Sequence, residues 1–260
     1  MVPLQQFQFI QYGVVDGLAT LAINRPPFNV LDIPTMGELN DALDACQEDS
    51  SVKLLVITGI GDKAFSAGVE VADHTPDKVD QMIDAFHGIF RRLHRMSMPI
   101  IAVVNGVALG GGMELAIACD MIVAAAGAKF GQPEIKLAVF PPVAAVLLPT
   151  LMPPARAMEI LLGGENFTSE EGRAMGLVNR VFPRETFAAE VQAFLAPFLK
   201  LSRVALLSTR KAIREAAGKP FNAALDTVET IYLQELMMTD DAKEGLAAFL
   251  EKRKPVWRNS

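Results

Sequence analysis

The stretch "PIIAVVNGVALGGGMELAIACDMIVAAA" (99–126) decides the fold of this 260-residue chain. Its ends, 99–104 and 120–126, are short apolar runs typical of buried strands, and the triple glycine at 110–112 opens a helical segment between them. Strand, helix and strand in this order predict an α/β core with parallel pairing. A membrane span needs about 20 uninterrupted apolar residues. Polar residues and glycines interrupt this stretch, so we expect a soluble core.

The same alternation continues on both sides of this stretch. Apolar spacing predicts two strands within 7–24, joined by an Asp-Gly turn, and a further strand at 52–58. It also predicts a helix at 34–47. Another helix is expected to begin at Thr75 as the N-cap, with Pro76 at the first helical position. Strands and helices alternate to about residue 182, and the following chain is almost wholly helical, with 203–218 and 221–238 as expected helices. We therefore predict two regions: an α/β core with the functional site at 1–200 and a helical region at 201–260.

Composition excludes several classes of protein. A net charge of −6 argues against a nucleic-acid partner, which requires a basic face. Two cysteines make no disulfide framework and fit a reducing compartment. The first residues, "MVPLQQFQFIQ", lack the basic and continuous apolar parts of a signal peptide. We expect a cytoplasmic protein that binds neither nucleic acid nor membrane.

The usual catalytic motifs are missing from the sequence. It has no phosphate-binding glycine loop ending in Lys-Ser or Lys-Thr, and no G-x-S-x-G nucleophile motif. His87 and His94 lie seven residues apart on one predicted helix, but no cysteine or carboxylate stands beside them at ligand spacing, so we expect packing roles and no metal. Backbone amides and carboxylates remain as candidates for chemistry.

Two glycine-containing turns, "KAFSAGVE" (63–70) and "ALGGGME" (108–114), each follow a predicted strand. Such turns can leave backbone N–H groups unpaired, and two that converge form an oxyanion hole. Taken alone, both fit ordinary strand-to-helix turns. Glu114 equally fits a partner of the helix dipole, and Glu134 in "FGQPEIK" (130–136) fits a loop glutamate.

The run 99–135 resembles the enoyl-CoA hydratase (crotonase) superfamily through its N-G-x-A-x-G-G-G-x-E-L and F-G-x-P-E elements. Supporting segments occur in the family's order: "NRPPFNVLD" (24–32), "KAFSAGVEV" (63–71), "AMGLVNRVFP" (174–183) and "EGLAAFLEKRKPVW" (244–257). The resemblance implies an α/β, crotonase-like spiral of repeated ββα units, with C-terminal helices that assemble trimers or dimers of trimers.

The resemblance also implies roles for individual residues. The N–H groups of Val69 and Gly111 would form the oxyanion hole for a thioester oxygen. Glu114 and Glu134 match the two catalytic carboxylates of hydratases, with Glu134 delivering the C2 proton and Glu114 acting mainly on the water. Many relatives keep only one acid, so the pair favours water addition across the double bond of an enoyl-CoA.

Coenzyme A would be part of the substrate, and no other cofactor is expected. By resemblance, Arg25, Lys63 and Ala67 meet the CoA, and Phe249 and Lys252 lie near its adenine end. For each single cation, a solvated surface charge is an equally good interpretation.

Two segments depart from the common hydratase pattern. "FPPVAAVLLP" (140–149) stands where most hydratases carry a P-G-x-G-G-T-like segment. Pro142 lacks an N–H and Val143 adds bulk, so we expect an acyl pocket of a different shape. "GVEVADHTPDKV" (68–79) places His74 beside the acyl site. Both segments resemble a subgroup that acts on alicyclic dienoyl-CoA thioesters such as cyclohexa-1,5-diene-1-carbonyl-CoA.

Alternative functions stay open at this point. Within the superfamily they are double-bond isomerisation and ring hydrolysis of an acyl-CoA. From a different class, the chain fits a non-catalytic acyl-CoA-binding homologue.

Overall fold

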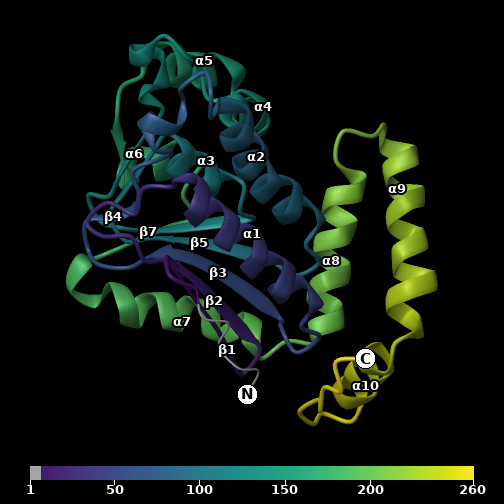
Figure 1. Ribbon diagram of the computed structural model, residues 1–260. Helices are drawn as coiled ribbons and strands as arrows, with labels where there is room; N and C mark the ends of the chain where they lie inside the picture. Colours follow the sequence, from purple (N-terminus) through teal and green to yellow (C-terminus); the bar gives the residue numbers. More distant parts are fainter. Residues whose placement is uncertain (1–6) are drawn as a thin grey trace.

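The computed structural model describes residues 7–260 and contains two sheets (Figure 1). The larger sheet has the strand order β1-β2-β3-β5-β7-β10, formed by Ile10–Val15, Leu18–Ile23, Leu54–Gly59, Ile100–Val104, Met121–Ala125 and Arg180–Phe182. Only β1 and β2 pair antiparallel; the other neighbours are parallel. Residues 1–6, which begin both the predicted core region and the segment judged for a signal peptide, lie outside the described residues.

The chain passes from the larger sheet to a smaller sheet three times in a repeating pattern. Its strands β4 (Ala64–Ser66), β6 (Val107–Leu109) and β8 (Lys129–Gly131) are parallel neighbours, and β9 (Phe167–Thr168) pairs antiparallel with β8. Strands β3, β5 and β7 of the larger sheet are each followed by a strand of the smaller sheet. The helical segments that come next are α2 (Val79–Arg95), α3 (Gly111–Ile117), and η2 (Pro133–Leu137) with α4 (Pro142–Leu151). These repeats confirm the predicted spiral of ββα units.

Helices cover both faces of the larger sheet. On β3, Leu55 and Ile57 face the main core with α1 (Ile33–Glu48) and α2, whereas Leu54 and Val56 belong to a second cluster with Val191 of α7 (Phe187–Leu199). Figure 1 shows α7 along one side of the sheet and α1 and α2 along the other. A strand buried on both faces explains the continuous apolar run at 54–57 within the predicted strand 52–58.

The C-terminal region is helical, as predicted. α8 (Arg203–Ala216) and α9 (Phe221–Thr230) form a hairpin beside the sheets, and α10 (Asp240–Leu250) lies at its far end (Figure 1). The buried Arg210 fixes α8 to the core, because its Nε donates to Asp120 Oδ2 at 2.7 Å and Nη2 donates to Leu93 O at 3.2 Å. The helix expected to continue to residue 238 changes after Thr230 into η4 (Ile231–Glu235) and η5 (Leu236–Met238).

The start of α2 differs from the prediction. The helix begins at Val79, with Lys78 at the N-cap and no side-chain cap, so the assignment of Thr75 and Pro76 was wrong. Residues 75–78 instead form a turn in which Thr75 O accepts hydrogen bonds from the N–H groups of Lys78 and Val79, both at 2.9 Å. Lys78 Nζ also pairs with the buried Asp73 at 3.3 Å.

Three further elements complete the description near the site: η1 (Val71–Asp73), α5 (Pro154–Gly163) and α6 (Ser169–Ala174). Within residues 7–260, none of the helices on its own has both the length and the apolar character required to span a bilayer. The segments Arg184–Leu199 and Arg203–Ala216 meet that criterion only as a pair, with a 95° bend between them.

Candidate active site

The ends of three parallel strands bring the predicted catalytic groups together. Val69 follows β4, Gly111 and Glu114 follow β6 on α3, and Glu134 follows β8 on η2. β4, β6 and β8 are neighbours in one sheet, so their carboxyl ends lie at the same edge. Residues that are up to 65 positions apart in sequence (69 and 134) therefore share one site.

Two backbone N–H groups at this edge have no acceptor. Leu31 N donates to Gly68 O and Leu31 O accepts from Glu70 N, so the N–H of Val69 between them is directed to the opposite side. Gly111 is the first residue of α3, where an N–H has no intrahelical acceptor. A Cβ built on Gly68 would lie 3.3 Å from Gly111 N, which places the two turns in contact. Within residues 7–260, neither N–H donates a hydrogen bond.

The triple glycine is explained by close approaches. Gly110 has a φ of 52°, and a Cβ there would lie 2.7 Å from Glu134 Oε1. A Cβ on Gly111 would lie 2.8 Å from Val69 Cγ2 and 2.8 Å from Phe86 Cζ. A side chain at Gly110 would push Glu134 away from α3, and a side chain at Gly111 would push the turn at Val69 away from it.

Glu114 is the most buried carboxylate of the site, with 2% of the residue exposed. Its Oε1 accepts hydrogen bonds from the N–H groups of Val143 and Ala144, both at 2.8 Å. The pKa of Glu114 is raised to about 7, mainly by burial and also by the nearby charge of Glu134, although the two hydrogen bonds lower it. The group therefore changes its protonation state near neutral pH.

Glu134 lies on η2, half-buried, and burial raises its pKa to about 6. Gln132 stands beneath it and is fully buried. With its amide nitrogen facing the carboxylate, Gln132 Nε2 lies 3.1 Å from both Oε1 and Oε2 of Glu134. The sequence reasoning missed Gln132. The available signal was a polar residue between a buried strand and Pro133.

The residues predicted to meet CoA are only partly brought to this edge. Ala67 lies in the β4 turn, with its N–H donating to Phe28 O, and Lys63 is exposed just before β4. Arg25 Nη2 lies 2.9 Å from Asp32 Oδ2, and its Nη1 lies 3.8 Å from Glu70 Oε2. The guanidinium is thus already paired with two carboxylates.

Phe249 and Lys252, also predicted to meet CoA, lie elsewhere in the chain. Phe249 is 83% exposed on α10, and Lys252 follows this helix. Figure 1 places α10 at the opposite end of the molecule from α3 and α4. A single copy of the chain does not bring these two residues to Glu114.

The predicted acyl-pocket residues occupy different surroundings. Pro142 and Val143 form the first turn of α4, directly against Glu114. His74 is exposed at the end of η1, with Nδ1 3.1 Å from the carbonyl oxygen of Glu70. Phe86 of α2 packs against the Gly111 turn, since its Cζ would lie 2.8 Å from a Cβ built on Gly111.

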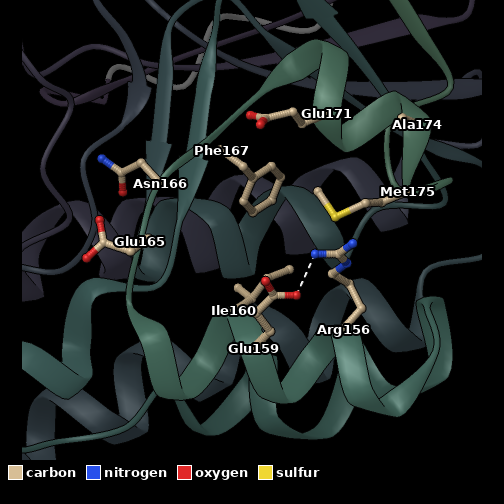
Figure 2. A pocket seen from close by; sticks show the side chains of 9 residues that line it. All are labelled: Arg156, Glu159, Ile160, Glu165, Asn166, Phe167, Glu171, Ala174 and Met175. Atoms are coloured by element: carbon tan, nitrogen blue, oxygen red, sulfur yellow. Dashed lines mark hydrogen bonds and ion pairs between the residues drawn. The ribbon is translucent and has the colours of Figure 1, made fainter.

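A separate cavity of about 320 Å³ lies between α5, β9 and α6 and includes none of the predicted site residues. Figure 2 shows the ion pair of Arg156 and Glu159 at its edge and the acidic side chains of Glu165 and Glu171 nearby. Three carboxylates against one cation make this cavity a poor site for a nucleotide phosphate.

The hydrogen bonds to Glu114 predict a difference in stability between two variants. Glu114→Ala removes the acceptor of two N–H groups, whereas the amide oxygen of Glu114→Gln can still accept both. An unsatisfied buried donor costs about 1–3 kcal/mol. We expect Glu114→Ala to melt about 4–8 °C below Glu114→Gln in a calorimetric scan. Equal melting temperatures would show that α4 does not depend on this acceptor.

Comparison with known proteins agrees with the fold and with the resemblance. Residues 13–260 match the enoyl-CoA hydratase/isomerase family profile. The chain is 37% identical to cyclohexa-1,5-dienecarbonyl-CoA hydratase of Thauera aromatica, covering 93% of each chain. It is 38% identical to crotonyl-CoA hydratase of Syntrophomonas wolfei, covering 91% of this chain and 93% of the other.

Solved structures show the same architecture. The crystal structure of enoyl-CoA hydratase from Bacillus anthracis superposes with a TM-score of 0.93 at 27% identity, covering 97% of this chain and all of the other. The fold and the relatives together define a hydratase-type lyase of enoyl-CoA thioesters. The chain belongs to the enoyl-CoA hydratase/isomerase family.

Proposed function

We propose that the protein adds water across the double bond of a 2-enoyl-CoA or cyclic dienoyl-CoA thioester through Glu114, Glu134 and the N–H groups of Val69 and Gly111. One observation carries the proposal. Two carboxylates with pKa values raised toward neutrality lie beside two N–H groups without acceptors, and no cation among residues 7–260 forms an ion pair with either carboxylate. Such groups suit proton transfer next to a developing oxyanion.

The mechanism follows from this arrangement. The thioester oxygen accepts hydrogen bonds from Val69 and Gly111, which stabilises negative charge as an enolate forms. Glu114 removes a proton from water while the water oxygen forms a bond to C3, and Glu134 gives a proton to C2. The pair begins and ends with one proton, which has moved from Glu134 to Glu114.

The raised pKa values predict a bell-shaped pH profile. Below about pH 6 both carboxyls hold protons and no base is available, and above about pH 7 both are ionised and no acid is available. We expect kcat/KM to fall on both sides of this window, with the two limits belonging to the coupled pair. Rates measured from pH 5 to 9 with a substrate of constant ionisation test this. A flat profile would contradict it.

The acyl group is tested by turnover. The two substrates to compare are the thioesters that appear in the names of the two relatives, crotonyl-CoA and cyclohexa-1,5-diene-1-carbonyl-CoA. Turnover is followed by the loss of absorbance of the conjugated thioester and by mass analysis of the product. We expect a product heavier by one water from at least one of them. A product of unchanged mass supports isomerisation instead. Calorimetric binding without turnover supports a non-catalytic acyl-CoA binder.

We also propose a homo-oligomer, a trimer or a dimer of trimers, built through 201–260. An apolar groove of about 370 Å³ runs between α8 and the segment formed by α9, η4 and η5. Large apolar side chains on α9, η4 and α10 are exposed, among them Phe221, Leu233 and Phe249. In such an assembly, Phe249 and Lys252 would meet the CoA held by another copy. We expect Leu233→Glu to weaken assembly in sedimentation velocity. A wild-type monomer at micromolar concentration would contradict the proposal.

A cytoplasmic location completes the proposal. Both cysteines, Cys46 and Cys119, are free and buried, which fits a reducing compartment. Fractionation of expressing cells tests it.

A further inference from the structure

The N-terminus of α4 has an unusual supply of hydrogen-bond donors. A helix normally presents several free N–H groups at this end. Here the N-cap is Pro141 and the first residue is Pro142, and proline has no N–H. The next two N–H groups, of Val143 and Ala144, both donate to Glu114 Oε1. Ala145 N already donates to Pro141 O at 3.0 Å.

All free donors at this helix end are therefore used by one carboxylate oxygen. No side chain caps α4, and its first turn contains no Ser, Thr, Asn or Asp to compete for the N–H groups. Glu114 takes the place of the missing cap from another helix, α3. Within residues 7–260, Oε2 of Glu114 accepts no hydrogen bond.

We propose that Val143 and Ala144 are positioning residues, whose N–H groups hold Oε1 of Glu114 at the start of α4 so that Oε2 alone exchanges the proton during hydration. This inference rests on the proposed function. It also gives the two prolines of "FPPVAA" (140–145) a role, because they supply no N–H, and Val143 and Ala144 supply the two that the carboxylate uses.

The arrangement also acts on the ionisation of Glu114. The N–H groups and the positive end of the helix dipole favour the ionised form. Burial and the charge of Glu134, the one titratable group that faces Glu114 from η2, favour the neutral form. Removing a donor should therefore raise the pKa of Glu114 and move the upper limit of the pH profile, near pH 7, to higher pH.

The first test uses the unmodified protein. Backbone amide resonances of Val143, Ala144 and Ala145 are followed by NMR from pH 5 to 9. We expect the resonances of the Val143 and Ala144 amides to shift with a midpoint near pH 7, where Glu114 ionises, and both shifts to disappear in Glu114→Gln. The amide of Ala145, which donates to a carbonyl, is the internal control. Amides of 143 and 144 that do not titrate, or that still titrate in Glu114→Gln, would overturn the inference.

The second test removes one N–H and keeps the side chains. Valine 143 is replaced by its α-hydroxy analogue, so that an ester oxygen stands where the N–H was, and the matched control carries the same change at residue 145. Hydrogen bonds to charged groups are among the stronger ones, so we expect the upper limit of the kcat/KM profile, near pH 7, to rise by about one pH unit in the first protein only. Val143→Ala, which retains the N–H, should keep the upper limit of the wild type.

The failures are distinguishable. Equal upper limits of the pH profile in the two ester proteins would overturn the positioning role while leaving hydration by Glu114 intact. Full hydration by Glu114→Gln would instead overturn the proposed function.

Discussion

Glu114→Gln and Glu134→Gln are each expected to lower kcat for hydration by at least about 100-fold, in line with the contribution of a positioned acid or base. Each variant keeps the shape of the side chain but removes a carboxyl that can transfer a proton. Because water addition needs one acid and one base, the two losses should be similar, and the double variant should lose little more than either single one. Initial rates at saturating substrate, pH 6.5, measure this.

Glu165→Gln is the matched control for both variants. Its side chain is 82% exposed and pairs with Lys136 at 2.8 Å, so it should retain the wild-type rate. An unchanged rate in either Glu114→Gln or Glu134→Gln would contradict hydration by a carboxylate pair. A loss confined to one of them would favour a one-acid reaction such as isomerisation.

Gly111→Pro is expected to lower kcat by about 100- to 1000-fold, the effect of losing one oxyanion donor. Proline is tolerated at the first position of a helix, and Gly111 occupies that position in α3. The substitution removes the N–H but also adds a Cβ that would lie 2.8 Å from Val69 Cγ2 and Phe86 Cζ. The steric effect needs its own control.

Gly111→Ala supplies this control, because it adds the same Cβ and retains the N–H. We expect Gly111→Ala to lose less activity than Gly111→Pro by at least about tenfold in kcat, while both bind the product CoA thioester in calorimetry. Equal kcat values in the two variants would show that crowding, and not the loss of the donor, lowers the rate.

The sequence predicted the order of the elements well where the pattern is local. The turn at Asp16 and Gly17 joins β1 to β2 with both φ values positive, as the Asp-Gly pair predicts. The run 99–126 becomes β5, β6, α3 and β7, although the short β6 was not predicted from the apolar pattern. Three-residue strands carry too few side chains to show a period of two.

Non-local contacts set the limits of prediction at the site. Resemblance selected Glu114 and Glu134, but the role of α4 depends on a hydrogen bond between residues 29 positions apart (114 and 143). Likewise, the charge on Arg25 is paired with Asp32 and Glu70, which no local pattern in "NRPPFNVLD" (24–32) indicates. The start of α2 was mispredicted because residues 75–78 form a separate turn before the helix, and Thr75 followed by Pro76 is also typical of such a turn.

A crystal structure with acetoacetyl-CoA, a thioester that offers no alkene to hydrate, tests the central claim most directly. The account predicts the thioester oxygen within about 3 Å of both Val69 N and Gly111 N, with the β-carbon between the carboxyl groups of Glu114 and Glu134. A thioester oxygen that contacts neither amide, or an acyl chain that reaches only one of the two carboxyl groups, would contradict it.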